Sequence, residues 1–401
     1  MRRSLYAFVL LGSCLAAPMA FAATPPKQPE KGPGGGDYKI TEVIKTGVGT
    51  VSSGSYVFYG NDTPAGPRPV VVFFHSWGAV NPALYGGFID HLARKGYLVL
   101  FPRFQEVNRS RPADAPERAD NLIREALAQL GSDQNARPDL TRVAYIGHSA
   151  GVPLALNVAA KAEGPAMPAP KLVFGFMPGG IASSEKERGI MLRDLSTVDP
   201  STLIVMMSGD REHLPSDRAS RRLFSETSGV PISRKLFMRA SSDDHGYPPL
   251  TATLASPGSP KPDYDASVIK LQPDPPRDPK QRNTWKWSAD MALSGPQTIL
   301  TQQIGNNGTD TLDYLAYWRT FEMAAEAAFA GKDASALQRD PKFIDMGNWS
   351  DGWPVRRLSA QTPKVEGQEK PEEQGPRRRL NMAPPETKEG GLNGFIRQLR
   401  S

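Results

Sequence analysis

Arg142-Val-Ala-Tyr-Ile-Gly147-His148-Ser149-Ala150-Gly151 is the stretch that decides how this chain folds. Its apolar run ends at a glycine, and an apolar, helix-compatible segment, residues 152–161, follows the second glycine. A strand, a G-x-S-x-G turn and a helix in this order are typical of a nucleophile elbow. Glycine is needed on both sides of the serine because side chains in so tight a turn would clash. The turn would lift the Ser149 hydroxyl above the end of a parallel sheet.

Strand and helix patterns alternate on both sides of this stretch. Buried strands are predicted over residues 69–74, 97–101, 142–146, 171–177, 202–207 and 233–240, and helices over 82–95, 114–130, 216–225 and 309–330. Residues 38–51 and 55–59 read as an antiparallel hairpin at the sheet edge. Such alternation predicts an α/β fold with a mostly parallel sheet and helices on both faces. The loops after residues 74, 146, 207 and 240 then open at one edge, where sites in such sheets lie.

Proline, glycine and charge mark the other boundaries of the chain. Residues 23–37 are expected to be a disordered Pro/Gly linker and residues 359–401 a disordered tail, which leaves one domain at 38–358. Within it, residues 248–308 form a Pro-rich excursion without a clear element, and 341–358 read as an ordered cover. Only about 24 residues join the strands at 171–177 and 202–207, too few for a large cap domain.

The first 22 residues have the pattern of a secretory signal. Two arginines precede an apolar run at 5–15, and Ala20-Phe21-Ala22 is an A-x-A cleavage site, so the mature chain would start at Ala23. We therefore expect a secreted or periplasmic protein with no stable membrane span, because the apolar run is too short. Leu11-Gly12-Ser13-Cys14 also resembles a lipoprotein box, which would attach lipid to Cys14 instead.

Cysteine usage and charge exclude several kinds of chemistry. Cys14 is the single cysteine, so the mature chain would have no disulfide, thiolate metal site or cysteine nucleophile. The formal net charge is +6, and removal of Arg2 and Arg3 with the signal would leave +4. Much of that charge lies in the tail around 377–379, so we expect no nucleic-acid partner. The sequence does not indicate the oligomeric state.

A serine nucleophile needs a base, which is nearly always histidine. The chain has five histidines, and only His213 and His245 follow Ser149. In chains with such an elbow the acid precedes the base, and His213 lies in the loop that should carry the acid. His245 is therefore the expected base. Asp210 and Glu212, just after strand 202–207, are both candidates for the acid.

The oxyanion hole requires two converging backbone N–H groups. Ala150, directly after the serine, would supply the first. The loop after strand 69–74 would supply the second, from Trp77 or Ser76, and the Trp77 ring would wall the pocket or simply pack.

Four motifs in this order resemble the α/β-hydrolase superfamily: His75-Ser76-Trp77-Gly78, Gly147-His148-Ser149-Ala150-Gly151, Gly209-Asp210-Arg211-Glu212 and Asp244-His245-Gly246. The chain looks closest to secreted bacterial hydrolases of the dienelactone hydrolase/esterase kind over about residues 40–358, including the runs 75–102 and 346–353. The resemblance favours Glu212 as the acid, three residues after the glycine. Two features depart from the family: Ser76 stands where a glycine is usual, and about 65 residues separate His245 from the helix at 309–330.

The expected function is a serine hydrolase that cleaves a small-molecule carboxylic ester through an acyl-enzyme on Ser149. No cofactor or metal is expected. Because fold and triad do not distinguish esters from amides, a secreted serine peptidase or lactone hydrolase remains an alternative. A non-catalytic envelope binding protein on the same scaffold is the other alternative.

Overall fold

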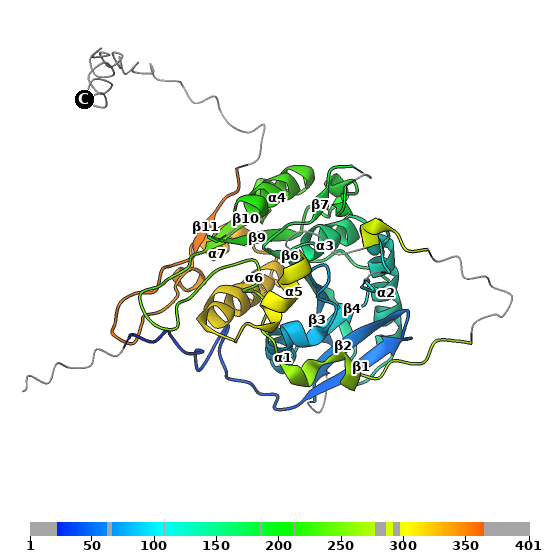
Figure 1. Ribbon diagram of the computed structural model, residues 1–401, viewed down its shortest axis with the longest axis horizontal. Coiled ribbons are helices and arrows are strands. Elements are labelled where there is room, and N and C mark those ends of the chain that lie inside the picture. The colour runs from blue at the N-terminus through cyan, green and yellow to red at the C-terminus, as the bar shows by residue number, and fades with distance from the viewer. Residues whose placement is uncertain are drawn as a thin grey trace, which may run out of the picture. The chain divides into compact units, whose positions relative to one another are not determined.

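A nine-stranded sheet organises the described part of the chain, in the order β1-β2-β4-β3-β5-β6-β9-β10-β11 (Figure 1). The computed structural model describes residues 22–61, 66–107, 109–164, 166–184, 187–211, 213–276, 286–291 and 297–364. The strands are β1 (Val43–Gly49), β2 (Gly54–Gly60), β3 (Arg68–Phe74), β4 (Leu98–Pro102), β5 (Pro138–His148), β6 (Leu172–Phe176), β9 (Leu203–Gly209), β10 (Lys235–Ala240) and β11 (Ser359–Gln361).

The six central strands from β4 to β10 are parallel, whereas β1, β2 and β11 pair antiparallel at the two edges. Residues 98–102 and 172–176 are buried throughout, because helices cover both faces of the sheet. The predicted strands and the predicted hairpin are therefore confirmed. Register pairs Phe74 with Gly147, which brings the end of β3 beside the end of β5.

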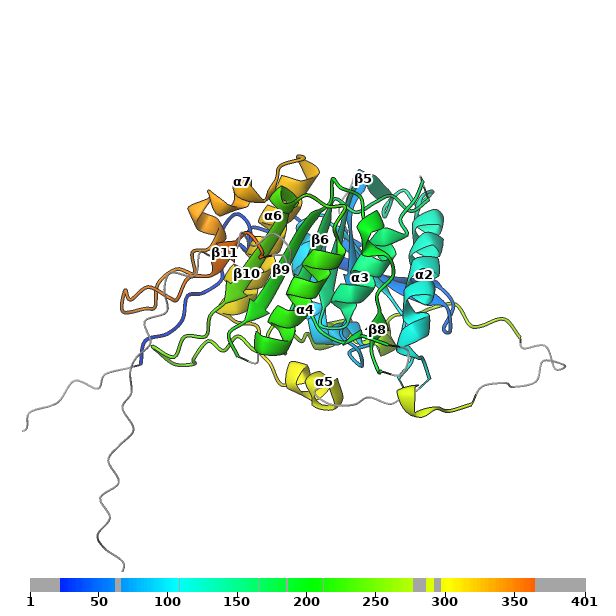
Figure 2. The same ribbon diagram turned by 90° about the horizontal axis from the view of Figure 1, so that it is seen from above.

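Two layers of helices enclose the sheet. The aromatic residues Phe73, Phe101 and Phe174 share one core with α1 (Gly86–Arg94), the π-helical segment η8 (Leu312–Trp318) and α6 (Arg319–Phe329). The opposite face packs against α2 (Ala115–Leu130), α3 (Gly151–Ala160) and α4 (His213–Glu226), which Figure 2 shows along one side of the sheet. This strand order, with parallel central strands and helices on both faces, is an α/β-hydrolase fold.

Short elements fill the connections. The described residues between β6 and β9 form only the two-residue strands β7 (Ile181–Ala182) and β8 (Ile190–Met191) and the turn η3 (Leu195–Thr197), so they carry no large cap. Elsewhere the short elements are η1 (Pro82–Tyr85), η2 (Pro112–Asp114), η4 (Ile232–Arg234), α7 (Ala334–Gln338) and η9 (Pro341–Phe343).

The Pro-rich excursion is more ordered than its composition suggests. It contains η5 (Pro262–Tyr264), η6 (Ala266–Val268), η7 (Ala289–Met291) and α5 (Gln297–Gly305). Tyr264 is fully buried and donates a hydrogen bond to Asp90, 2.7 Å away. Residues 277–285 and 292–296 lie outside the described residues.

The structure differs from the sequence interpretation at both ends of the domain. Residues 23–37 are not a disordered linker, because they lie against the domain in a network of hydrogen bonds to residues far along the chain. At the other end, residues 359–361 are not tail but form β11, which pairs with β10. Residues 1–21 of the predicted signal segment 1–22 and residues 365–401 of the predicted tail 359–401 lie outside the described residues. Among the described helices, none has the length and hydrophobicity that a membrane crossing needs.

Candidate active site

The turn after β5 has the geometry of a nucleophile elbow. Ser149 adopts a left-handed backbone with φ of 52°, one of two non-glycine residues in the described chain that do so. Its N–H donates to the carbonyl oxygen of Phe176 at 2.9 Å, and its own carbonyl accepts from Val152 at 3.0 Å. Because this conformation is costly for a residue with a side chain, the surrounding structure must hold it in place.

Both glycines of the motif are required by the packing around the turn. A Cβ atom on Gly151 would lie 2.0 Å from the carbonyl oxygen of Phe74, and one on Gly147 would lie 2.6 Å from Cα of Val152. The first contact involves the neighbouring strand β3 rather than the turn itself. The glycines therefore serve the close approach of β3, β5 and α3 as well as the tightness of the turn.

The Ser149 hydroxyl lies beside the loop that follows β6. Ser149 is 4% exposed, and a Cβ atom built on Gly179 would lie 3.6 Å from its Oγ. The Gly179 amide also donates to the Ser149 carbonyl at 3.3 Å. Residue 179 therefore forms one wall of the space in front of the hydroxyl.

Two backbone amides, one in the elbow and one in the loop after β3, have no acceptor among the residues that the structure describes. One belongs to Ala150, at the start of α3, and the other to Trp77, in the loop after β3. The neighbouring amides are occupied: that of Ser76 donates to the Tyr85 hydroxyl at 3.2 Å, and that of Gly78 donates to Gln105 at 2.7 Å. Of the two residues predicted for the second oxyanion donor, Trp77 is the one with a free amide. Its ring is 3% exposed and belongs to the core on the α2–α3 face, so packing explains the ring.

A chain of buried hydrogen bonds joins the loop after β3 to the elbow. His148 Nε2 lies 2.7 Å from the carbonyl oxygen of Leu254, which can only accept, so Nε2 carries the proton. Nδ1 must then accept from the Tyr85 hydroxyl, 2.9 Å away, while the Tyr85 oxygen accepts from the Ser76 amide. Burial lowers the pKa of His148 to about 4, which keeps it neutral and unsuited to act as a base at neutral pH.

The His75 ring is also held in place by its surroundings. It is fully buried, its ring stacks on Phe104 with centroids 4.0 Å apart, and its Nδ1 donates to the carbonyl oxygen of Ser76 at 2.8 Å. Burial lowers its pKa to about 4. His91, buried on the other face, has both ring nitrogens engaged by Tyr38 and Glu322.

His245 lies on a loop at the carboxyl end of β10, and its side chain is 30% exposed. Its Nε2 is 2.8 Å from a carboxylate oxygen of Asp351, and its ring stacks on Trp353 with an interplanar angle of 13°. Hydrogen bonds from His245 and from the Trp353 amide lower the pKa of Asp351. Of the described histidine side chains, this is the one with both solvent access and a carboxylate partner. No hydrogen bond joins it to Ser149 in the described structure.

The two predicted acids have different outcomes. Asp210 accepts two hydrogen bonds from Ser242, from its amide at 2.8 Å and from its hydroxyl at 2.6 Å, and so holds the start of the loop that carries His245. Glu212 lies outside the described residues, as does the side chain of His213. Among the described residues, the carboxylate in contact with His245 is Asp351 and not Asp210.

Asp243 also holds this loop. It accepts hydrogen bonds from the amides of His245 and Arg356 and from the Trp349 indole, at 3.1, 2.8 and 3.2 Å. Burial alone would raise the pKa of Asp243, but these donors outweigh it and lower the pKa. Asp243 therefore remains a carboxylate that ties the His245 loop to the segment 349–356.

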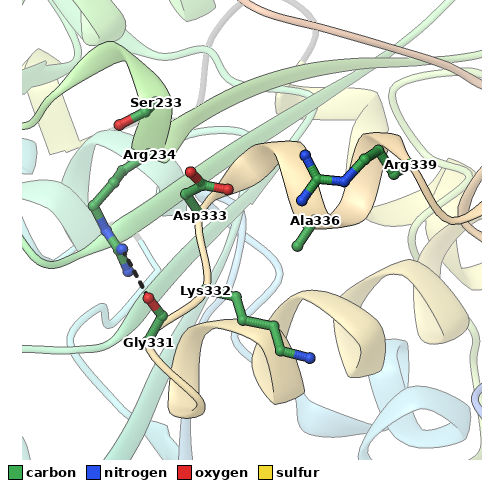
Figure 3. Close-up of a pocket in the computed structure, with 7 residues that line it drawn as sticks. All are labelled: Ser233, Arg234, Gly331, Lys332, Asp333, Ala336 and Arg339. Carbon is green, nitrogen blue, oxygen red and sulfur yellow. Dashed lines mark hydrogen bonds between the residues drawn. The ribbon is translucent and has the colours of Figure 1, made fainter.

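Two hollows lie near the edges of the sheet. One of about 440 Å³ is close to the loop after β3, and Gln105 and Asn81 are among the residues that line it. A wider one of about 680 Å³ lies where β10 begins, at the opposite end of that strand from His245 (Figure 3). Its lining consists of Ser233, Arg234, Gly331, Lys332, Asp333, Ala336 and Arg339, and contains none of the predicted catalytic residues. The described residues contain no cluster of potential ligands for a metal ion.

The sequence interpretation did not find Asp351, Tyr85 or Gly179. The sequence does contain a local signal for Asp351, because the run 346–353 that includes it resembles secreted hydrolases. No local signal marks the other two, because their contacts with His148 and Ser149 join separate loops.

Residues 38–178 match the protein-family model described as Chlorophyllase. The matched span runs from the start of the domain to the end of β6 and includes both the loop after β3 and the elbow. A search of curated proteins found no match. The matched family is of the α/β-hydrolase type, which agrees with the fold and points to a serine hydrolase of ester substrates. The narrower likeness to dienelactone hydrolases stays a prediction.

Proposed function

We propose that this protein hydrolyses carboxylic esters through an acyl-enzyme on Ser149. The observation that carries the proposal is the elbow, in which Ser149 adopts a left-handed backbone and is followed by the Ala150 amide, which has no acceptor among the described residues. The loop after β3, whose Trp77 amide also has no described acceptor, begins beside the elbow because Phe74 pairs with Gly147. Amides held in advance where an oxyanion would form stabilise it without reorganisation during the reaction. The family match over residues 38–178 supports the same class of substrate.

The proposed reaction has two halves. Ser149 Oγ attacks the ester carbonyl carbon while its proton passes to His245, and the carbonyl oxygen becomes an oxyanion held by the two amides. The C–O bond to the leaving alcohol then breaks, and the imidazolium returns the proton to that alcohol. Water attacks the acyl-enzyme in the same way, and the carboxylic acid leaves as Ser149 recovers its proton.

His245 is our choice of base because the other described histidine rings are buried and fully held by the packing. The reaction requires its ring to reach the Ser149 hydroxyl, and such catalytic hydrogen bonds often form only once substrate is bound. We assign Asp351 as the acid that orients the ring, on the strength of their 2.8 Å contact. Asp210 and Glu212 remain the competing assignment from the sequence.

We also propose that the enzyme acts outside the cytoplasm, after cleavage between Ala22 and Ala23. The support is the signal pattern of residues 1–22. Mass spectrometry of the protein isolated from its own cells tests this. A chain that begins at Ala23 agrees with both the location and the cleavage site, a lipid-modified Cys14 contradicts the cleavage site alone, and a chain that keeps residues 1–22 contradicts both.

The central test is hydrolysis of p-nitrophenyl esters from acetyl to octanoyl by the wild type and Ser149→Ala. Removing a triad nucleophile should lower kcat by at least about 10³-fold. Ser233→Ala, in the distant hollow of Figure 3, is the matched control and should hydrolyse the esters at the wild-type rate. Equal activity of the wild type and Ser149→Ala would exclude Ser149 as the nucleophile.

A second comparison separates the candidate acids. Asp351→Asn should lower kcat by about 10²-fold or more, because the neutral amide does not stabilise the charged ring and can hold the imidazole in the wrong tautomer. Asp244→Asn changes an 84% exposed carboxylate on the loop that carries His245 and should leave kcat unchanged. If Asp210→Asn or Glu212→Gln abolishes turnover and Asp351→Asn does not, the acid is the one that the sequence predicted.

A further inference from the structure

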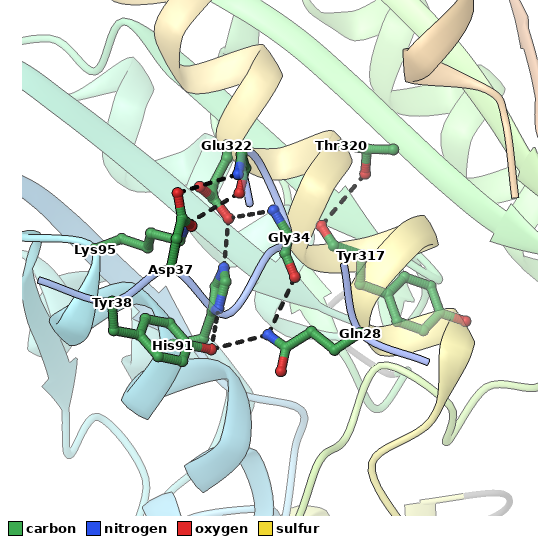
Figure 4. A network of polar contacts seen from close by, with 10 residues as sticks. Gln28, Gly34, Asp37, Tyr38, His91, Lys95, Tyr317, Thr320 and Glu322 are labelled. Carbon is green, nitrogen blue, oxygen red and sulfur yellow. Dashed lines mark hydrogen bonds and ion pairs between the residues drawn. The ribbon is translucent and has the colours of Figure 1, made fainter. Parts of the chain in front are cut away.

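Residues 23–38, which we call the N-terminal strap, cross from the α1–α6 face of the domain to the His245 loop. Figure 4 shows the far end of the strap held between α1 and α6. There the Gly34 amide donates to a carboxylate oxygen of Glu322 at 2.8 Å, and Tyr38 contacts Nδ1 of His91 at 2.8 Å. The opposite ring nitrogen of His91 contacts the same Glu322 oxygen.

Two further anchors act along the strap. The Lys95 ammonium donates to the carbonyl oxygen of Gly32 at 3.0 Å and pairs with Asp37. The buried Thr311 hydroxyl, just before η8, donates to the carbonyl oxygen of Pro26 at 2.5 Å. Most of these partners are more than 50 residues away along the chain, so the strap is held by the tertiary fold and not by local structure.

The first residues of the strap contact the two loops that present His245 and Asp351. The Ala23 carbonyl accepts from the Tyr247 amide at 2.8 Å. Thr24 makes two bonds to Ser350: its carbonyl accepts from the Ser350 amide, and its own amide donates to the Ser350 hydroxyl, both at 2.9 Å. Tyr247 is two residues from His245, and Ser350 is next to Asp351.

The contact with the His245 loop is close enough to dictate its sequence. A Cβ atom on Gly246 would lie 2.0 Å from the Ala23 carbonyl oxygen and 2.7 Å from the Trp349 ring. Glycine at 246 thus lets the strap and the segment around 349 both approach the residue that follows His245. The backbone of Gly246 does not need a left-handed conformation, so close approach is the reason for the glycine.

We infer that the N-terminal strap is a positioning element for the proposed catalytic base, because it bridges the 245–247 and 349–353 loops and fixes His245 against Asp351. This inference rests on the proposed function of His245. It assigns the strap no contact with substrate: its action passes through the Tyr247 and Ser350 amides. Releasing the strap should therefore change turnover more than substrate affinity.

The test removes one anchor that lies away from His245. Thr311→Val keeps the shape of the side chain and deletes the hydroxyl that holds Pro26, whereas Thr311→Ser keeps the hydroxyl and is the matched control. Lys95→Gln releases the strap at a different point, with Lys95→Arg as its control. Hydrogen exchange of peptides that contain Gly34, Tyr247 and Ser350 is followed by mass spectrometry in the full chain, alongside kcat and KM for p-nitrophenyl esters.

In Thr311→Val and Lys95→Gln, exchange should rise at least fivefold in all three peptides, and kcat should fall three- to tenfold with KM within twofold. The two conservative variants should restore wild-type values. Faster exchange at Gly34 with unchanged exchange at Tyr247 and Ser350 would overturn the inference. Because exchange is measured without substrate, it decides this question even if the wild type hydrolyses no ester and the proposed function fails.

Discussion

Gly151→Ala is the substitution that most directly tests how the elbow is built. The added Cβ atom would stand 2.0 Å from the carbonyl oxygen of Phe74 and 2.8 Å from that of His75. Such atoms do not approach within 3.0 Å, so β3 and α3 must separate by about 1.0 Å. Phe74 lies in the centre of the sheet, so neither partner can move freely.

The expected cost follows from this overlap. Overpacking against buried backbone destabilises a fold by roughly 3 kcal/mol. For the roughly 320 described residues the entropy of unfolding is near 0.7 kcal/mol per kelvin, so Tm should fall by about 4 °C. The same separation moves the Trp77 amide away from Ser149, and a misplacement of 1 Å in such a site costs about 10²-fold in rate.

Calorimetry and hydrolysis of p-nitrophenyl acetate measure the two effects. Gly308→Ala is the control, because a Cβ atom there would meet nothing within 4 Å, and its Tm should stay within about 1 °C of the wild type. If Gly151→Ala also keeps its Tm within 1 °C and retains full activity, β3 and α3 are not in close contact. That contact then does not fix the position of the proposed oxyanion donors.

Two further predictions concern the buried network behind the elbow. Tyr85→Phe leaves the Ser76 amide and His148 Nδ1 unpaired. The free energy of unfolding measured in urea should therefore fall by about 2 kcal/mol, and kcat should fall about tenfold. An unchanged free energy of unfolding would mean that water replaces the hydroxyl. His75 and His148 titrate near pH 6.5 when unfolded but have pKa values of about 4 when folded, so the unfolded chain binds more protons between these values. The free energy of unfolding should thus fall as the pH drops from 6.5 to 4, by up to about 1.4 kcal/mol per pH unit for each histidine, and a flat stability from pH 7 to 5 would contradict their burial as neutral rings.

The sequence predicted the sheet well because the signals for it are local. A strand buried on both faces reads as an unbroken apolar run, as at 69–74, and the structure has β3 there. The elbow could also be predicted from the sequence, because its strand, glycines and helix are consecutive. The π-helical part of the helix at 309–330 was not readable, because the apolar periodicity there does not distinguish it from an α-helix.

The partners of the loops could not be predicted for a different reason. Composition marked residues 23–37 as disordered, yet their hydrogen bonds go to residues such as Glu322 and Ser350, about 300 positions away. A Pro/Gly segment that buries little apolar surface can still be ordered when tertiary donors and acceptors satisfy its backbone. The same holds for the partner of His245: chain order favoured Asp210 or Glu212 as the acid, which stays a prediction, whereas the described contact to His245 comes from Asp351, 106 residues later.

The two halves of the proposed site differ in how they are held. Ser149 and the two free amides lie just past the ends of β3 and β5 and at the start of α3, where neighbouring side chains are buried and the glycines leave no room for movement. His245 and Asp351 instead lie on exposed loops, joined to the domain by Asp243 and by the strap. Local opening costs least where backbone hydrogen bonds are exposed and apolar contacts are few. The loops with His245 and Asp351 should therefore open before the elbow with Ser149 does. The strap and Asp243, rather than the core of the sheet, then limit how long the proposed site stays assembled.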